Sequence, residues 1–165
     1  TCVIAAPSIS LEGKYLWILR EAPVGEQPLL WIKTGFELLL TVPCTILAGV
    51  LLTVALRLSV GEGAVMLLAA LLFSVIHAAF GVLMGLTFPK LDAVNETVVV
   101  KQSLAVTLGM FAPMAALGVC GLLYWLGGLI APWAAPALPL VLLAAFAAAC
   151  VLILARKGPA MLRAL

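Results

Sequence analysis

The sequence is poor in charge: of its 165 residues only 10% are Asp, Glu, Lys or Arg, and it holds a single histidine. In soluble globular domains about a quarter of the residues are charged. The formal net charge is only +2, and no cluster of basic residues is interleaved with aromatic ones, which argues against nucleic acid as a partner. The scarcity of charge predicts that lipid, rather than water, surrounds much of the chain.

Sequence motifs that carry chemistry are missing as well. There is no GxxxxGK[ST] phosphate-binding loop, and the four cysteines form no CxxC pair. One histidine and seven scattered acids supply neither a Ser-His-Asp set nor the ligands of a metal. The sequence therefore predicts no catalysis, no cofactor and no metal site in this chain. It also predicts that the cysteines are small apolar packing residues.

Long apolar runs dominate what is present, since 65% of the residues are hydrophobic. Four runs are each long enough to supply the roughly 20 helical residues that cross a hydrocarbon core of about 30 Å. They cover about 34–56, 64–88, 103–126 and 133–155. Their apolar residues are continuous rather than alternating, which favours helices over the strands of a barrel. We expect an all-α polytopic membrane protein with about four transmembrane helices and one amphipathic cytoplasmic helix.

The basic residues predict an orientation for these spans. Of the nine Lys and Arg residues, eight lie on one side of a four-span layout. Arg57, which follows the first span, lies on the other side. Lys and Arg in short loops favour the cytoplasmic side. We therefore expect a multi-pass protein of a bacterial cell membrane, with both ends of the spanning region in the cytoplasm.

One short stretch, ISLEGKYLWILREAPV at 9–24, holds two acids and two bases in an otherwise apolar chain. Ser8 or Ser10 can cap a helix there, and Pro23 would end it. Its apolar residues recur at helical spacing, at Leu11, Tyr15, Ile18 and Leu19. This pattern predicts an amphipathic helix at the membrane surface whose charged face meets a partner. A plain juxtamembrane anchor is the alternative.

The predicted organisation has four parts. Residues 1–7 end a truncated preceding helix, 8–33 form the cytoplasmic amphipathic segment, 34–157 form the transmembrane region, and 158–165 form a cytoplasmic tail. The apolar start without a preceding basic region is unlike a signal peptide. We interpret the chain as a C-terminal fragment of a longer membrane protein.

Two polar residues inside the predicted spans are candidate functional groups. Glu37 lies one turn after Lys33, so the two can pair at i, i+4 near the membrane surface. His77 lies deeper, where an ionisable group is a functional candidate by default. The sequence places no acid near His77, and Ser74 or a helix carbonyl is the expected partner of its ring. For both residues a structural role competes with a role in transport.

Two motifs carry a resemblance to a known family. The first is Glu12-Gly13-Lys14, followed by Leu19, by Ala22-Pro23-Val24, and by Lys33 at the head of a long apolar helix. It resembles the permeases of type-2 ATP-binding-cassette exporters. The second, FPKLD at 88–92 with Asn-Glu at 95–96 and VKQS at 100–103, resembles a block in a bacterial branch of such permeases.

The chain departs from that branch in two places. An aromatic residue is more usual where Ala93 or Val94 stands, and a serine is more usual where Gly25 stands. The sharp motifs together cover only about 30 residues, and hydropathy alone carries the resemblance over the rest.

The resemblance implies a mechanism and partners. A permease does not hydrolyse ATP itself; a separate cytoplasmic ATPase subunit does so and grips a coupling helix of the permease. The implied contact residues are Glu12, Gly13, Lys14, Arg20 and Glu21, and a second cytoplasmic contact falls on Asp92 and Glu96. The remaining implied partners are the lipid bilayer and a second permease half, unless one long permease fuses both halves.

Two other functions stay open at the level of sequence. A membrane scaffold or assembly protein would have the same apolar helices without a transport role. An ion-coupled secondary transporter would need more intramembrane acids than Glu37, together with a titrating His77.

Overall fold

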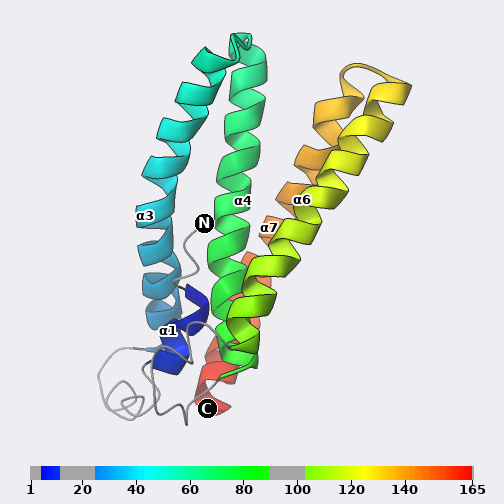
Figure 1. The fold of residues 1–165 in the computed structure, drawn as a ribbon. Coiled ribbons are helices and arrows are strands. Elements are labelled where there is room, and N and C mark those ends of the chain that lie inside the picture. Colours follow the sequence, from blue (N-terminus) through cyan, green and yellow to red (C-terminus); the bar gives the residue numbers. More distant parts are fainter. Residues whose placement is uncertain (1–4, 12–24, 90–102, 165) are drawn as a thin grey trace.

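The computed structural model describes residues 5–11, 25–89 and 103–164. Within these ranges every regular element is a helix, and the described part contains no strand. The elements are α1 (Ala5–Leu11), α3 (Glu26–Ala55), α4 (Val60–Thr87), α6 (Leu104–Ile130) and α7 (Ala134–Ala164) (Figure 1).

Length and composition explain why four of these helices can cross a membrane. They have 27 to 31 residues, and their most apolar windows have mean hydropathies from 1.9 to 2.8. A helix rising about 1.5 Å per residue needs only about 20 residues to cross the hydrocarbon core. The predicted all-α fold, with four long apolar helices and one short helix, is confirmed.

The helices extend beyond the apolar runs that predicted them. The first begins at Glu26 rather than near residue 34, with Pro28 tolerated in its first turn, where no intrahelical partner for its nitrogen is needed. The last continues through Arg156, Lys157 and Pro159 to Ala164. Polar residues at a helix end can lie beyond the hydrocarbon, so hydropathy underestimates helix length.

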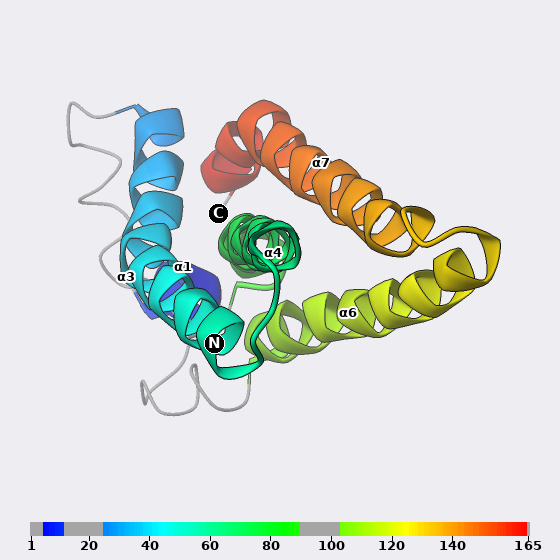
Figure 2. The ribbon, with the colours of Figure 1, turned by 90° about the horizontal axis from the view of Figure 1, so that it is seen from above.

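Helix α4 is the centre of the bundle (Figure 2). It packs against α3, α6 and α7, and α1 lies against it near the end where α3 begins and α7 finishes (Figure 1). The α3–α4 and α6–α7 connections lie at the opposite end (Figure 1). Apolar cores form around α4, one of them with α1, α3 and α7 and the other with α6 and α7.

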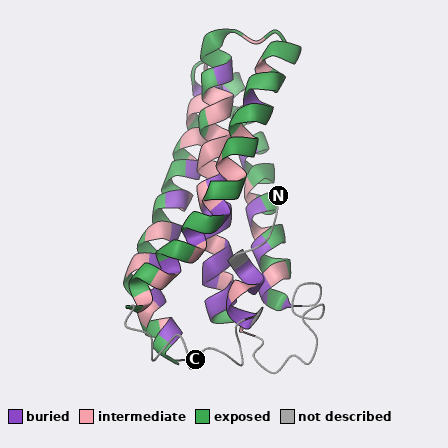
Figure 3. Cartoon of the chain, turned by 90° about the vertical axis from the view of Figure 1, so that its left-hand side faces the viewer, coloured by how far each residue is buried: buried purple, intermediate pink, exposed green. Residues whose placement is uncertain are grey.

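Buried residues gather around α1 and in the half of α4 that packs near it, from Ser74 to Leu86, whereas α3, α6 and α7 keep exposed faces (Figure 3). Those faces are apolar: Leu39 is 71% exposed, Leu47 64% and Trp125 64%. Contiguous apolar surface of this kind is unfavourable in water and is expected where lipid tails cover it.

Helix α1 is inserted into the bundle. Ala6 and Ile9 have no exposed surface, and Ser10 is 5% exposed. Gly85 of α4 permits the approach, because a Cβ at that position would lie 2.5 Å from the carbonyl oxygen of Ala6. The amphipathic helix predicted over 9–24 is described only as far as Leu11; its remainder lies outside the described residues.

The turn between α3 and α4 is built from local hydrogen bonds. Arg57 adopts a left-handed backbone with φ of 53°, and the N–H of Leu58 donates to the carbonyl of Thr53. Ser59 caps α4: its hydroxyl accepts from the N–H of Glu62, and the Glu62 carboxylate accepts from the N–H of Ser59. This reciprocal cap begins α4 directly after the turn, so that α3 and α4 run antiparallel.

Candidate functional site: a polar contact between α3 and α4

A hydrogen bond joins two ionisable side chains inside the α3–α4 pair. Nδ1 of His77 lies 2.8 Å from Oε1 of Glu37. The side chains are 4% and 1% exposed, respectively. Burying one such group alone is costly, and their contact offsets part of that cost. We call this contact the Glu37–His77 pair.

Hydroxyl groups continue the polar contact along the same helices. Oγ1 of Thr45 on α3 lies 3.2 Å from Oγ of Ser74 on α4. Ser74 also donates to the carbonyl of Ala70, and Thr41 donates to the carbonyl of Glu37. In a lipid environment such hydrogen bonds satisfy groups that would otherwise be unpaired in hydrocarbon.

A groove of about 500 Å³ runs beside these groups. We call it the α3–α4 groove. It is lined by Leu40, Thr41, Cys44, Thr45 and Ala48 of α3 and by Ser74 and His77 of α4. Cys44 is an exposed free cysteine, and Leu40 is 44% exposed, so the groove opens on the apolar outer surface. Its wall therefore combines hydrogen-bonding groups with alkyl side chains.

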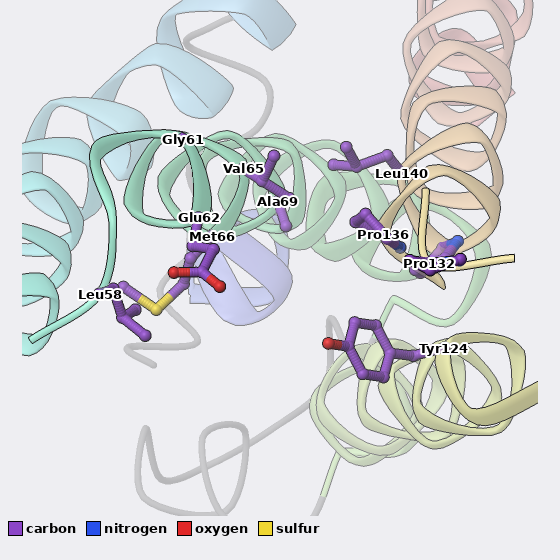
Figure 4. Close-up of a pocket in the computed structure, with 11 residues that line it drawn as sticks. Leu58, Gly61, Glu62, Val65, Met66, Ala69, Tyr124, Pro132, Pro136 and Leu140 are labelled. Carbon is purple, nitrogen blue, oxygen red and sulfur yellow. The ribbon is translucent and has the colours of Figure 1, made fainter. Parts of the chain in front are cut away.

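A second cleft of about 530 Å³ lies near the end of the bundle that holds the α3–α4 turn, between α4 and the α6–α7 hairpin. Its wall is mainly apolar, with Tyr124 on one side and Glu62 on the other (Figure 4). The Glu62 carboxylate is already held by the backbone and hydroxyl of Ser59 in the α4 cap. The Glu62 carboxylate is therefore committed to the helix cap, which leaves the Tyr124 hydroxyl as the other polar side-chain group of this cleft.

The structure corrects the sequence-based view of His77. No acid was expected near this residue, yet Glu37 is its hydrogen-bond partner. The two are 40 residues apart in the chain and meet only because α3 and α4 pack antiparallel. Ser74, the expected partner of the ring, bonds Thr45 and the carbonyl of Ala70 instead.

The other predicted site residues lie outside the described part of the chain. This applies to both groups of predicted cytoplasmic contacts, which are Glu12, Gly13, Lys14, Arg20 and Glu21 in the first and Asp92 and Glu96 in the second. Their contact with an ATPase subunit stays a prediction. Among residues 5–11, 25–89 and 103–164, no three His, Cys, Asp or Glu side chains are grouped so that they could hold a metal ion.

Comparison with known protein families decides the family. The model of the family described as "Putative ATP-binding cassette" matches residues 2–126, which is most of the chain. The chain belongs to this ATP-binding cassette family. No curated protein and no solved structure matches it.

Membership of the ATP-binding cassette family corrects the assignment drawn from the two short motifs. The chain was expected to be a permease subunit of a type-2 exporter, and the family match names an ATP-binding cassette instead. The motifs cover about 30 residues, whereas the match extends over 2–126 and so outweighs them. The predicted function, a permease component of an ATP-driven exporter, is wrong for the same reason.

The prediction that the chain is not an enzyme is also contradicted. The matched family is described as an ATP-binding cassette, and this assignment overturns the expectation that the chain is not an enzyme. The prediction depended on the lack of GxxxxGK[ST] and of clustered acids. A motif search tests only one way of binding phosphate, and the family match is independent of it.

Proposed function

We propose that this chain is the membrane-embedded part of an ATP-dependent protein of the ATP-binding cassette family. In this proposal α3, α4, α6 and α7 cross the lipid bilayer, and ATP binding and hydrolysis supply the energy for the protein's action. The lipid bilayer is then the direct partner of the exposed apolar faces of α3 and α6.

The observation that carries the proposal is the position of the family match. Residues 2–126 include all of α3 and α4 and most of α6. Three of the four helices that are apolar enough to span a membrane therefore belong wholly or largely to the matched region. Apolar helices and the ATP-binding cassette assignment thus apply to the same residues.

Photolabelling with an azido analogue of ATP tests the proposal. The full-length protein, reconstituted in lipid nanodiscs with Mg²⁺, is expected to be labelled by the analogue and to release phosphate from ATP. Excess ATP should prevent the labelling, and AMP at the same concentration should not. Mapping the labelled peptide would identify the nucleotide-binding residues. A protein that keeps its helical circular dichroism but takes up no label and releases no phosphate would contradict the proposal.

We further propose that the end of the bundle holding the start of α3 and the finish of α7 faces the cytoplasm. Lys33, Arg156, Lys157 and Arg163 belong to this end, and Arg57 belongs to the other. Lys and Arg favour the cytoplasmic side of a membrane. A bacterial cell membrane remains the proposed location.

Two single-cysteine variants test this orientation. In a background without the native cysteines, Val60→Cys reports the end with the α3–α4 turn and Lys157→Cys reports the opposite end. Both native side chains are exposed. A membrane-impermeant maleimide is expected to label Val60→Cys in intact cells and Lys157→Cys only after permeabilisation. The reverse pattern would overturn the proposed orientation.

A further inference from the structure

The imidazole of His77 has two nitrogens, and only Nδ1 has a partner among the residues that the structure describes. Nδ1 lies against the Glu37 carboxylate, while His77 makes no other hydrogen bond within the described residues. The roles of the two atoms depend on the tautomer of the ring: opposite an ionised carboxylate, which only accepts hydrogen bonds, Nδ1 carries the proton. In a neutral ring Nε2 is then a hydrogen-bond acceptor. A buried acceptor without a partner is costly, because folding removes it from water.

The unpartnered nitrogen belongs to a side chain that lines the α3–α4 groove. The side chain of His77 is only 4% exposed, so bulk water is not a hydrogen-bond partner for Nε2. The ring is held in place by the bond to Glu37 and by a tilted contact with Phe73 at 6.2 Å between ring centroids. The groove is therefore lined by an imidazole ring held in place by these two contacts, and in the tautomer with the proton on Nδ1 this ring offers an acceptor.

The rest of the groove indicates what could meet this acceptor. The hydroxyls of Thr41, Thr45 and Ser74 are engaged with carbonyls or with one another, and they form its polar side. Leu40 and Ala48 supply alkyl surface beside them. The groove opens to the outer surface of α3, where Leu40 is 44% exposed. A molecule entering from lipid would place its head group on the polar side and its chain along the alkyl side.

We infer that the α3–α4 groove binds an amphipathic molecule from the bilayer, an alkyl chain whose head group donates an O–H or N–H hydrogen bond to Nε2 of His77. A groove of about 500 Å³ lies within the size range of small-molecule sites. The inference requires that the helices lie in lipid and does not depend on nucleotide. Its test uses no ATP, so failure of the ATP experiment would leave it unaffected.

Nitrogen NMR on the only histidine of the chain provides the first test. The full-length protein, labelled with ¹⁵N-histidine and placed in lipid bilayers, is expected to show one protonated and one unprotonated ring nitrogen. Adding 1-decanol should shift the unprotonated signal with a saturable dose dependence. Methyl decyl ether, which has a similar chain and no donor, should not shift it. Equal shifts with the two probes, or none with decanol, would overturn the inference.

Labelling of Cys44 provides the second test, because this exposed thiol lines the same groove. Cys2, Cys120 and Cys150 are first replaced, so that bromobimane reports Cys44 alone. One net hydrogen bond is worth about 0.5–1.5 kcal/mol, so decanol should protect Cys44 at a concentration about two- to tenfold lower than the ether does. The substitution His77→Phe should abolish this difference. Persistence of the difference in a folded His77→Phe protein would contradict the site; if that variant fails to fold, the nitrogen shifts in the native protein decide.

Discussion

Replacing Glu37 with leucine is expected to lower the free energy of unfolding by about 1–3 kcal/mol, the cost of leaving a buried hydrogen-bonding group without its partner. His77 would keep its buried position on α4 and lose the acceptor for its Nδ1 proton. The substitution Glu37→Gln retains an acceptor at this position, so it should recover much of the loss. Unfolding of the purified protein in mixed micelles, followed by tryptophan fluorescence, measures these differences.

A double-mutant cycle separates the Glu37–His77 pair from other effects, because Glu37 makes a further interaction besides the one with His77. Glu37→Leu, His77→Leu and the double variant complete the cycle. The coupling energy is expected to be on the order of 1 kcal/mol, as for hydrogen bonds between membrane helices. Additive single effects would show that the two side chains do not stabilise each other.

The substitution Gly127→Ala is expected to destabilise the α6–α7 hairpin by about 1–3 kcal/mol, as overpacking does. A Cβ at this position would lie 2.7 Å from the carbonyl oxygen of Ala134 and 2.9 Å from Cα of Ala135. These are backbone atoms, which cannot move aside by changing a rotamer. The turn itself would have to shift. Unfolding in mixed micelles measures this change as well.

Gly121 provides a matched control on the same helix. A Cβ there would meet nothing within 4 Å. Alanine is the better helix former by up to about 1 kcal/mol, so Gly121→Ala should leave stability unchanged or raise it. If both variants were equally stable, the close approach of α6 and α7 at Gly127 would be wrong.

Sequence predicted the helices well because membrane spans have a strong signature. Apolar runs of more than 20 residues have few alternatives to a spanning helix. Each of the four runs lies in a helix that is long and apolar enough to cross a membrane. Helix ends were less predictable. Arg156 and Lys157 looked like the start of a tail, yet they continue α7, where Gly158 packs against Leu30 of α3. That contact depends on tertiary packing, which hydropathy does not report.

The sequence identified the residues of the candidate site but not the contact between them. Glu37 and His77 were each identified as polar residues inside apolar spans, but their contact was not, because it depends on the register between two helices. The spacing of the two residues from the turn could have predicted this contact. Arg57, at the turn, lies halfway along the 40 residues that separate the two, so an antiparallel hairpin brings them to the same depth. The second imidazole nitrogen and the groove required side-chain positions, which the sequence does not supply.

Dipolar NMR between Glu37 and His77 in lipid bilayers tests most directly the claim that α3 and α4 are joined inside the membrane by this polar contact. The protein carries ¹⁵N in its single histidine and ¹³C in the side-chain carboxyl carbons of glutamate. Hydrogen-bonded groups with an N–O distance of 2.8 Å should give one carboxyl signal that is strongly dephased by nitrogen, and Glu37→Gln should remove that signal. If no carboxyl signal is dephased in the folded protein, the Glu37–His77 pair does not form in the membrane, and the account of the α3–α4 groove fails with it.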